Sequence, residues 1–579
     1  MSRWPWFFVC AILGLALLAC GFLVPAHLRA IDSRVLEAAG QNTPGLVARG
    51  QALADAQKLG AAQLLLAAAQ EQGVAGRDRL GATVTNLAQQ HPDWRVWGGP
   101  EPRLEGLLGF GGQSADSPRP DIQPFVDFIV RREAREKALE SLQSSPRPSV
   151  QELLRCRQLT NMAIFAPSDS ASGQAFDAAL STAGLLLDDE RLADKLRDGL
   201  SALATGANRG GNSAPLEQAL MDLLSLGERM NWGQLAAFVG RIEDTETLRM
   251  LAHLVREHEG QLPAIFSAVE LTGEPSAVAK YLMKFDQSGA GDLALSLRFG
   301  AGAVNELLQR NQPVHQPGFG ERIGRQGPLA AFAFLAVNCS LRSPWIALMF
   351  KWFLYLWSGF LLAAAMHFAR PAPPALEEPL QVRGFHVARE VLFALGFLLV
   401  VLMLSEPFLA QQSQKVEFPF RLRLPGVGAA VPAGTPSAQA TLMNQLNQTS
   451  PGVWLTMLLF FVLQALIYTA CLVKLAEIKR QRVLPRVKLR LLENEEHLFD
   501  AGLYLGFAGT IVSLILVSLH IFQLSLMAAY SSTSFGIIFV SVFKIFHLRP
   551  ARRTMLLQAE ATPVETVGSP AVPAFAPTS

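Results

Sequence analysis

The hydrophobic residues of this chain are gathered into long runs near its N-terminus and in its last third. Each run is close to the roughly 20 residues that a helix needs to cross about 30 Å of hydrocarbon. The expected fold class is therefore an all-α, polytopic membrane protein. Six spans are predicted, over Trp4–Val24, Ile346–Phe368, Val391–Ala410, Val453–Val473, Ala501–Phe522 and Leu524–Phe546.

The first run is open to three interpretations. It follows a single basic residue, Arg3, and is long for the apolar core of a signal peptide, which favours an uncleaved anchor over residues 1–25. Alternatively, Val24-Pro25-Ala26 is a cleavage site, or Leu17 to Cys20 is a loose lipoprotein processing box. All three interpretations export the residues that follow.

Basic residues orient the spans, because loops rich in Lys and Arg remain in the cytoplasm. The loop after the fourth run and the segment after the sixth are both basic, so the last two spans must form a tight hairpin near His520–Gln523. Counting back places residues 26–345 and the loop 411–452 outside, with 346–410 as a membrane hairpin. Residues 555–579 are expected to be a disordered tail. The basic residues are Lys474, Lys479, Arg480, Arg482, Arg486, Lys488 and Arg490, then Lys544, Arg549, Arg552 and Arg553.

The exported region, residues 26–345, shows the three- and four-residue spacing of apolar positions that predicts amphipathic helices. It is clear in "LADKLRDGLSAL", "LEQALMDLLSLG" and "TLRMLAHLVREH". Helices of about a dozen residues alternate with short turns, which favours stacked hairpins in a solenoid-like domain. Two stretches rich in Gly, Pro and Ser, Gly98–Pro120 and Gly206–Pro215, are predicted loops and candidate boundaries of a smaller N-terminal unit.

Composition and motifs argue against several classes of function. Half of the residues are hydrophobic, and the formal net charge of +2 gives no reason to expect nucleic acid as a partner. The five cysteines include no CxxC pair, so neither a disulfide framework nor a metal centre is predicted. GxSxG and Walker motifs are absent from the sequence. We therefore expect neither an enzyme nor a cofactor.

Three short stretches of the exported region contain residue types that sites use. His253 and His258 are separated by about 500° of helical turn, so solvated face residues are the favoured interpretation. Gly318–Gly327 is glycine-rich but follows no predicted strand, which favours a linker over a phosphate-binding loop. The acidic run Asp188–Glu190 is most simply the first turn of the next helix.

The last two spans each have a stripe of small and hydroxyl-bearing residues at helical spacing. The stripes consist of Gly502, Gly506, Gly509, Thr510 and Ser513, and of Ser525, Ala529, Ser532, Thr533 and Gly536. Such stripes allow close helix packing, with each hydroxyl bonded to a carbonyl one turn back. Facing each other, they would instead form a polar seam between the two spans. Both interpretations are open at this point.

The segments "LGFAGTIVSLIL" and "LMAAYSSTSFGIIFVSV" resemble the paired signature of the MotA/TolQ/ExbB proton-channel family. That family has Gly-Thr in one helix and a threonine shortly before a glycine in the next, as at Gly509-Thr510 and at Thr533 with Gly536. The resemblance implies that residues 453–554 assemble as a pentamer around two helices of a partner. The partner's membrane aspartate would exchange protons along Thr510 and Thr533. The chain departs from the family at Ala528, where ExbB and TolQ have glutamate.

One acidic residue, Glu406, lies at the end of the third predicted span. Because Pro407 ends that helix, we expect Glu406 at the solvated membrane interface, and a proton-relay role is the less favoured interpretation. The leading functional hypothesis is a bacterial inner-membrane stator-type subunit that forms a homo-oligomer, with a single-span partner carrying an aspartate. Residues 26–345 would bind envelope proteins in the periplasm. The alternative is a non-conducting membrane scaffold that binds envelope proteins.

Overall fold

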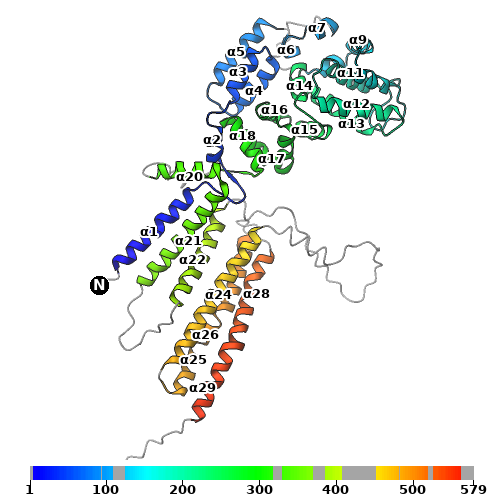
Figure 1. The fold of residues 1–579 in the computed structure, drawn as a ribbon. Coiled ribbons are helices and arrows are strands. Elements are labelled where there is room, and N and C mark those ends of the chain that lie inside the picture. Colours follow the sequence, from blue (N-terminus) through cyan, green and yellow to red (C-terminus); the bar gives the residue numbers. More distant parts are fainter. Residues whose placement is uncertain are drawn as a thin grey trace, which may run out of the picture. The chain divides into compact units, whose positions relative to one another are not determined.

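The computed structural model describes residues 4–92, 94–108, 124–316, 329–369, 385–406, 451–481, 483–518 and 526–561 (Figure 1). These residues are almost entirely helical, which confirms the all-α fold class. They form two compact units, which we call the helical domain and the membrane unit. The helical domain comprises Ala30–Ile323 and Phe334–Pro344, and the membrane unit comprises Met1–Arg29, Gly324–Ala333 and Trp345–Ser579.

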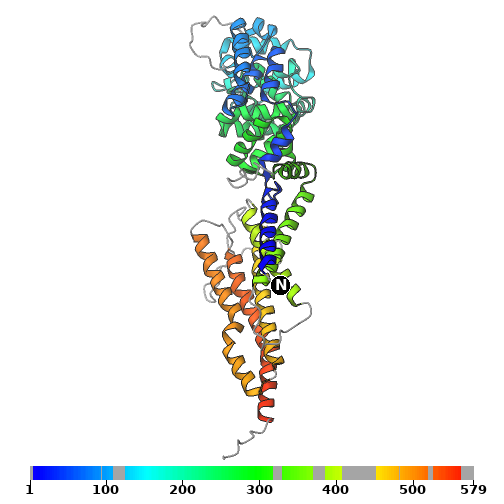
Figure 2. The ribbon, with the colours of Figure 1, turned by 90° about the vertical axis from the view of Figure 1, so that its left-hand side faces the viewer.

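The helical domain consists of short helices joined by tight turns, as the spacing of apolar residues predicts (Figures 1 and 2). Its elements up to the middle of the domain are β1 (Ile31–Asp32), α2 (Ser33–Gly40), α3 (Leu46–Asp55), α4 (Leu59–Glu71), α5 (Arg77–Gln90), α6 (Trp94–Trp97), α7 (Pro102–Leu108), α8 (Val126–Ile129), α9 (Arg132–Gln143), α10 (Pro148–Arg155), η1 (Cys156–Gln158) and α11 (Gln174–Asp188). There follow α12 (Asp194–Asn208), α13 (Ala214–Gly227), α14 (Trp232–Val239), α15 (Thr245–Glu257), η2 (Glu259–Gln261), α16 (Leu262–Thr272), α17 (Pro275–Phe299), α18 (Ala301–Arg310), β2 (Val314–His315) and α20 (Ala330–Arg342).

One hydrophobic core extends through the helical domain from Ile31 to Val314. Nearly all of α11 is buried, since the sequence "AALSTAGLLL" has small or apolar residues on all sides, and α11 packs against α9, α10 and α13. The expected separate N-terminal unit is therefore wrong for the described residues, because helices on both sides of Gly98–Pro120 share this core. Part of that predicted loop is helix α7, and only residues 209–213 separate α12 from α13. A solenoid arrangement stays a prediction.

The start of the helical domain forms a short parallel pairing with the strand that follows α18: β1 pairs with β2, and Ile31 lies opposite Val314. The hydroxyl of Tyr281 donates to Asp292 Oδ2 at 3.0 Å, and the backbone N–H of Val314 donates to the same oxygen at 3.0 Å. Burial raises the pKa of Asp292. The strand β1 is therefore held beside β2, and β2 is fastened to α17 through Asp292.

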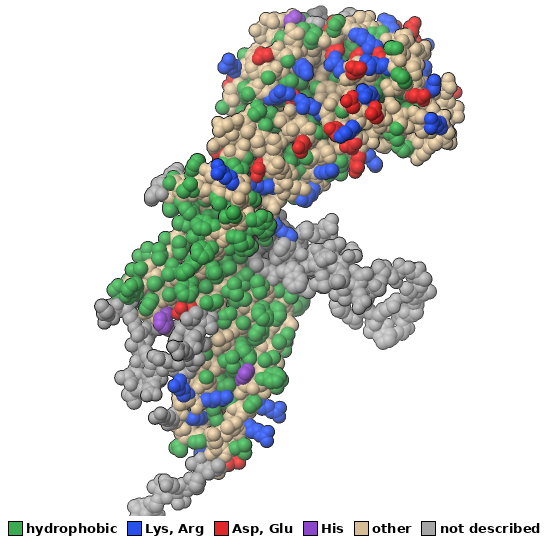
Figure 3. All heavy atoms as spheres, viewed as in Figure 1, with side chains coloured by type: hydrophobic (Ala, Val, Ile, Leu, Met, Phe, Trp, Pro, Cys, Tyr) green, Lys and Arg blue, Asp and Glu red, His purple; other side chains and the backbone are tan. Residues whose placement is uncertain are grey.

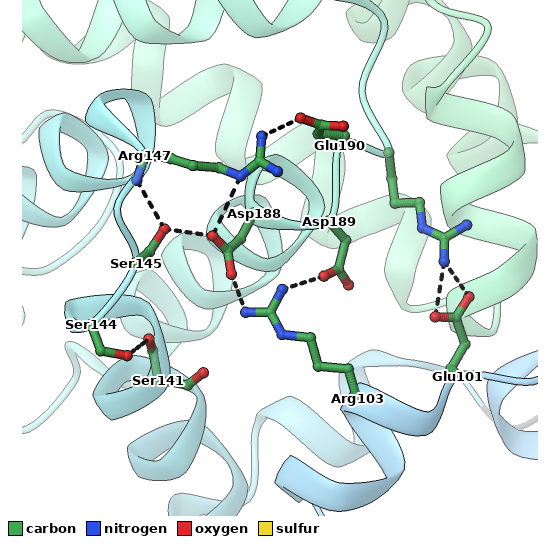
Figure 4. Close-up of polar contacts among 10 residues, drawn as sticks. Glu101, Arg103, Ser141, Ser144, Ser145, Arg147, Asp188, Asp189 and Glu190 are labelled. Atoms are coloured by element: carbon green, nitrogen blue, oxygen red, sulfur yellow. Dashed lines mark hydrogen bonds and ion pairs between the residues drawn. The ribbon is translucent and has the colours of Figure 1, made fainter.

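The acidic run Asp188–Glu190 has a different role from the one expected. Asp188 is the last residue of α11, and the run fastens this helix end to neighbouring segments instead of starting α12 (Figure 4). Arg103 forms ion pairs with Asp188 and Asp189, and Arg147 Nη1 lies 2.6 Å from Glu190 Oε1. The first-turn prediction is wrong because these arginines, distant in sequence, reach the carboxylates from other elements.

A second buried carboxylate, Glu217 of α13, accepts the backbone N–H groups of Ala163, Ile164 and Phe165 at 2.9, 2.6 and 2.8 Å. Burial by itself would raise the pKa of Glu217, but these donors and the Ser213 hydroxyl outweigh it and hold that pKa below its usual value. The carboxylate thus fixes the segment that precedes α11.

We predict that Glu217→Gln lowers the free energy of unfolding of the helical domain by about 2 kcal/mol at neutral pH, because hydrogen bonds to a charged acceptor are lost. The folded-state pKa is below the unfolded value of about 4.3, so the stabilisation is present above that value. It disappears as the pH falls through the folded-state pKa. Thermal unfolding against pH should show a shallower acid limb in the variant, whereas exposed Glu140→Gln should leave it unchanged.

The membrane unit consists of long apolar helices and a group of shorter ones. They are α1 (Trp4–Leu23), α21 (Pro344–Ala369), α22 (Phe385–Ser405), α24 (Pro451–Arg480), α25 (Pro485–Asn494), α26 (Glu496–Phe499), α27 (Ala501–Ser518), α28 (Leu526–Phe543), the π-helix η3 (Lys544–Leu548) and α29 (Arg549–Ala561). Apolar side chains cover much of its surface in Figure 3.

Four described helices are long and apolar enough to cross a membrane, namely Trp4–Leu23, Pro344–Ala369, Thr456–Arg480 and Tyr530–Glu560. Shorter apolar helices cover Ala330–Arg342, Glu390–Ser405 and Ala501–Ile515. This pattern is consistent with a multi-pass membrane protein. The count of six spans stays a prediction. The expected hairpin at His520–Gln523 lies outside the described residues, as do all but the last two residues of the expected loop 411–452, which belong to α24.

Two stretches expected to be irregular are helical. The residues expected to form a basic loop after the fourth span instead form the last turns of α24 and the helix α25. The expected disordered tail begins inside α29, which continues to Ala561. The tail prediction is wrong for residues 555–561, because Met555 and Ala559 are buried and α29 packs against α25. Residues 562–579 lie outside the described part of the chain.

Candidate functional site

Helices α27 and α28 pack in opposite directions with their glycines in contact. A Cβ atom added at Gly506 would lie 2.8 Å from the carbonyl oxygen of Ser532, and one at Gly536 would lie 2.8 Å from that of Gly502. Both distances are shorter than a Cβ atom tolerates against backbone. The glycines therefore set the spacing of the two helices, as in small-xxx-small contacts.

We predict that Gly506→Ala and Gly536→Ala each force α27 and α28 apart, because backbone on the facing helix cannot move aside as a side chain can. The control is Gly396→Ala in α22, where the nearest neighbour of an added Cβ is a Val462 methyl at 3.8 Å. Unfolding in mixed micelles should show a loss of about 1–3 kcal/mol for the first two variants and little change for the control. Equal stability of all three would contradict the tight contact.

The threonines singled out by the sequence meet at this contact. Thr510 Oγ1 lies 2.6 Å from Thr533 Oγ1, and both hydroxyls lie near the carbonyl oxygen of Gly506, at 3.1 and 3.3 Å. Each hydroxyl has one proton and can donate in either direction. Either threonine can therefore donate to Gly506 while accepting from the other, so the pair has two hydrogen-bond arrangements of opposite direction.

A third helix adds a side chain that the sequence analysis missed. Gln464 of α24 is 2% exposed, and its Nε2 donates to the carbonyl of Gly502 at 2.9 Å. Its Oε1 is buried without a hydrogen-bond partner among the described residues. A cavity of about 10 Å³ adjoins it, with Gly502 and Phe539 among its lining residues. Gln464 is the one amide side chain in the apolar run Val453–Val473, a signal that could have identified it.

We call the group formed by Gln464, Gly502, Gly506, Thr510, Thr533 and Gly536 the polar seam. Most other stripe residues also face the protein: Ser513 and Ser532 are buried, and an added Cβ at Gly509 would touch Ser532. Four successive residues of α28, Ser531–Ser534, have hydroxyl side chains; of these, Ser531 is buried as well, whereas Ser534 is exposed. Ser525 and the side chain of Ala529 lie outside the described residues. Apolar residues occupy the exposed sides, including Phe507, Ile511, Ile537 and Ile538.

A second polar group lies among α1, α21 and α22. Lys351 of α21 and Glu406 form an ion pair at 3.1 Å, with side chains 1% and 2% exposed. Lys351 Nζ also donates to the carbonyl of Ala26 at 2.8 Å and lies 3.3 Å from His27 Nδ1. The carboxylate accepts the N–H of Leu28 at 2.7 Å.

The expected position of Glu406 in water at the membrane interface is therefore wrong. Lys351, a single cation in an apolar run, compensates its charge, and the backbone around His27 supplies further hydrogen bonds to both charged groups. Because the Lys351 ammonium and the Glu406 carboxylate both have hydrogen-bond partners as well as each other, the arrangement stabilises the segment that leads from α1 into the helical domain. The ion pair is thus a structural fastening in the described state of the chain.

The remaining sequence candidates are not brought together. His253 lies 3.4 Å from Glu257, and His258 lies 3.3 Å from Asp286, so the two imidazoles have different partners. Gly318–Gly327 lies outside the described residues. In the part of the chain that the structure describes, no three His, Cys, Asp or Glu side chains are grouped as metal ligands.

Comparison of the chain with protein-family models, curated proteins and solved structures gives no match. Function must therefore be argued from the geometry of the polar seam.

Proposed function

We propose that residues 453–554 form a proton-conducting module of the MotA/TolQ/ExbB type, which acts in an oligomer of this chain with a partner that supplies a membrane carboxylate. The observation that supports this most directly is the polar seam itself. It combines two hydroxyls that can reverse their hydrogen bonds with a buried amide oxygen, on Gln464, that has no donor among the described residues.

A buried acceptor without a donor in an apolar surrounding costs free energy, about 1–3 kcal/mol. Such a cost is tolerated at functional sites, where a ligand or another chain supplies the missing group. A protonated carboxyl or a water molecule would donate to Gln464 Oε1. Thr510 of α27 and Thr533 of α28 face each other, and they would pass hydrogen bonds onward from Gln464.

A complete path requires more than one copy of this chain. The cavity beside Gln464 has a volume of about 10 Å³, which is at the lower limit for a single water molecule. Because α27 and α28 pack closely at Gly506 and Gly536, their described parts leave no room between them for a row of water molecules. The proposed path therefore lies where the polar seam meets a neighbouring helix of another subunit or of the partner.

The alternative function is a membrane scaffold without conduction, whose helical domain binds other envelope proteins. One observation favours it: the threonines already bond to each other, and one of them can donate to the Gly506 carbonyl, as packing hydroxyls in membrane helices commonly do.

The experiment is to purify the protein with its associated chains, identify any single-span component with a membrane aspartate, and measure proton flux after reconstitution. Thr510→Val/Thr533→Val should abolish flux and leave the oligomer assembled, because valine keeps the shape but cannot donate a hydrogen bond. Ser534→Ala, which removes an exposed hydroxyl from the same helix, is the control. Disassembly of the double variant would favour the scaffold.

A further inference from the structure

The end of the membrane unit formed by α25, α29 and the last turns of α24 has a surface that the proposed function does not use. Its basic residues are Lys479, Arg480, Arg486, Lys488, Arg490, Arg549 and Arg553, all exposed or half-buried. We call this set the basic surface. Within the described part of the chain, no ion pair joins any of them to an acidic side chain, and Figure 3 shows Lys and Arg side chains gathered at this end.

Four of the nearby acidic residues already have partners. Glu477 and Glu495 pair with Lys474, at 3.4 and 3.7 Å. Asp500 lies 2.7 Å from Lys544, and Arg552 forms an ion pair with Glu493 at 3.4 Å. These four acids are therefore paired with other cations, and among the described residues the basic surface forms no ion pair.

Exposed apolar side chains stand beside these cations. They are Val483, Leu484, Val487, Leu556 and Leu557. Between α24, α25 and α29 lies a cleft of about 340 Å³, lined by Lys479, Lys488, Thr554 and Gln558 over a floor that includes the buried Ala551 and Met555. A surface with cations at its edge and apolar groups between them fits a molecule that is anionic at one end and apolar at the other.

The lengths of the helices place this surface at the edge of a bilayer. The 30 residues of α24 extend over about 45 Å, which exceeds the roughly 30 Å of hydrocarbon. Lys479 and Arg480 thus lie about two turns beyond the apolar run Val453–Val473. That is the depth of phospholipid head groups, where an anionic surface attracts basic residues.

We propose that the basic surface binds the phosphate head groups of anionic phospholipids, with the cleft at Lys479 and Lys488 holding one head group. A second copy of this chain is a poorer occupant, because two such surfaces would bring unpaired cations together. A soluble acidic protein would satisfy the charges but would leave Leu484 and Leu557 without an apolar environment.

The test uses the full-length protein in mild detergent, titrated with phosphatidylglycerol or phosphatidylcholine and followed by native mass spectrometry of the bound lipid. We expect phosphatidylglycerol to bind more tightly. Lys479→Gln/Lys488→Gln should weaken it by about 25-fold, or about fivefold for each basic residue removed. The same charge loss in the helical domain, Lys137→Gln/Arg209→Gln, should have no effect.

Three results would overturn the proposal. The first is equal affinity for the two lipids, and the second is unchanged phosphatidylglycerol binding in a Lys479→Gln/Lys488→Gln variant of normal thermal stability. The third is displacement of the lipid by inorganic phosphate alone, which would assign the cleft to a soluble anion. Mass spectrometry also reports the number of chains, so loss of a dimer instead of a lipid would identify a second copy as the occupant.

Discussion

Replacing Lys351 by methionine is expected to destabilise the membrane unit by about 3–5 kcal/mol, because Glu406 would be left as a buried charge without its partner. The pair lies 3.1 Å apart with both side chains almost fully buried. Removal of the ammonium group also leaves the Ala26 carbonyl without its donor. The free energy of unfolding in mixed micelles measures the loss.

The design that isolates the ion pair is a double-mutant cycle with Glu406→Gln, which keeps an acceptor for the Leu28 N–H. Each single variant leaves one uncompensated charge, whereas the double variant leaves none, so its cost should be well below the sum of the two. We expect a coupling energy of about 2–3 kcal/mol. Exposed Lys137→Met in the helical domain serves as the control for loss of a lysine. Additive effects would mean that the two groups act independently.

The second large effect is expected at Gln464, and it rests on the proposed function. Gln464→Leu keeps the size of the side chain but removes both the bond to Gly502 and the unpaired acceptor. Proton flux in the reconstituted complex should fall at least tenfold, or by about 1.4 kcal/mol or more in the barrier. Stability should change by only about 1 kcal/mol, because one hydrogen bond is lost.

The control for this variant is Thr469→Val on the same helix. Thr469 Oγ1 donates to the Ala465 carbonyl one turn back and is not one of the polar-seam residues, so its loss should leave flux unchanged. Normal flux in Gln464→Leu, with assembly intact, would remove the amide from the proposed path. A collapse of assembly would instead assign Gln464 to helix packing.

Patterns among neighbouring residues predicted the features of this fold that do not depend on contacts between distant residues. Runs of apolar residues gave the long helices, and three- and four-residue spacing gave the short helices of the exported region. The stripe of Gly502, Gly506 and Thr510 predicted which side of α27 meets another helix, because helical geometry fixes which residues share a side. These predictions need no knowledge of contacts between distant residues.

The missed features all depend on partners far away in the sequence. The carboxylates Asp188 and Glu406 were each assigned to a local role, and each is held by a cation from another element, Arg103 or Lys351. The helical residues 555–561 were assigned to a tail by composition, but their burial against α25 stabilises them. Gln464 is the one amide side chain in an apolar run, and its partner, the Gly502 carbonyl, belongs to another helix.

Helices α27 and α28 hold Thr510 and Thr533 against each other, and the proposed function requires that both face away from lipid. Oxidation of a Thr510→Cys/Thr533→Cys pair, in a chain whose native cysteines are replaced and which is reconstituted in a bilayer, tests this arrangement most directly. We expect complete formation of an intramolecular disulfide, whereas Phe507→Cys/Ile537→Cys on the exposed sides should remain reduced. Free thiols at positions 510 and 533 that react with a lipid-soluble maleimide as fast as those at 507 and 537 would contradict the account.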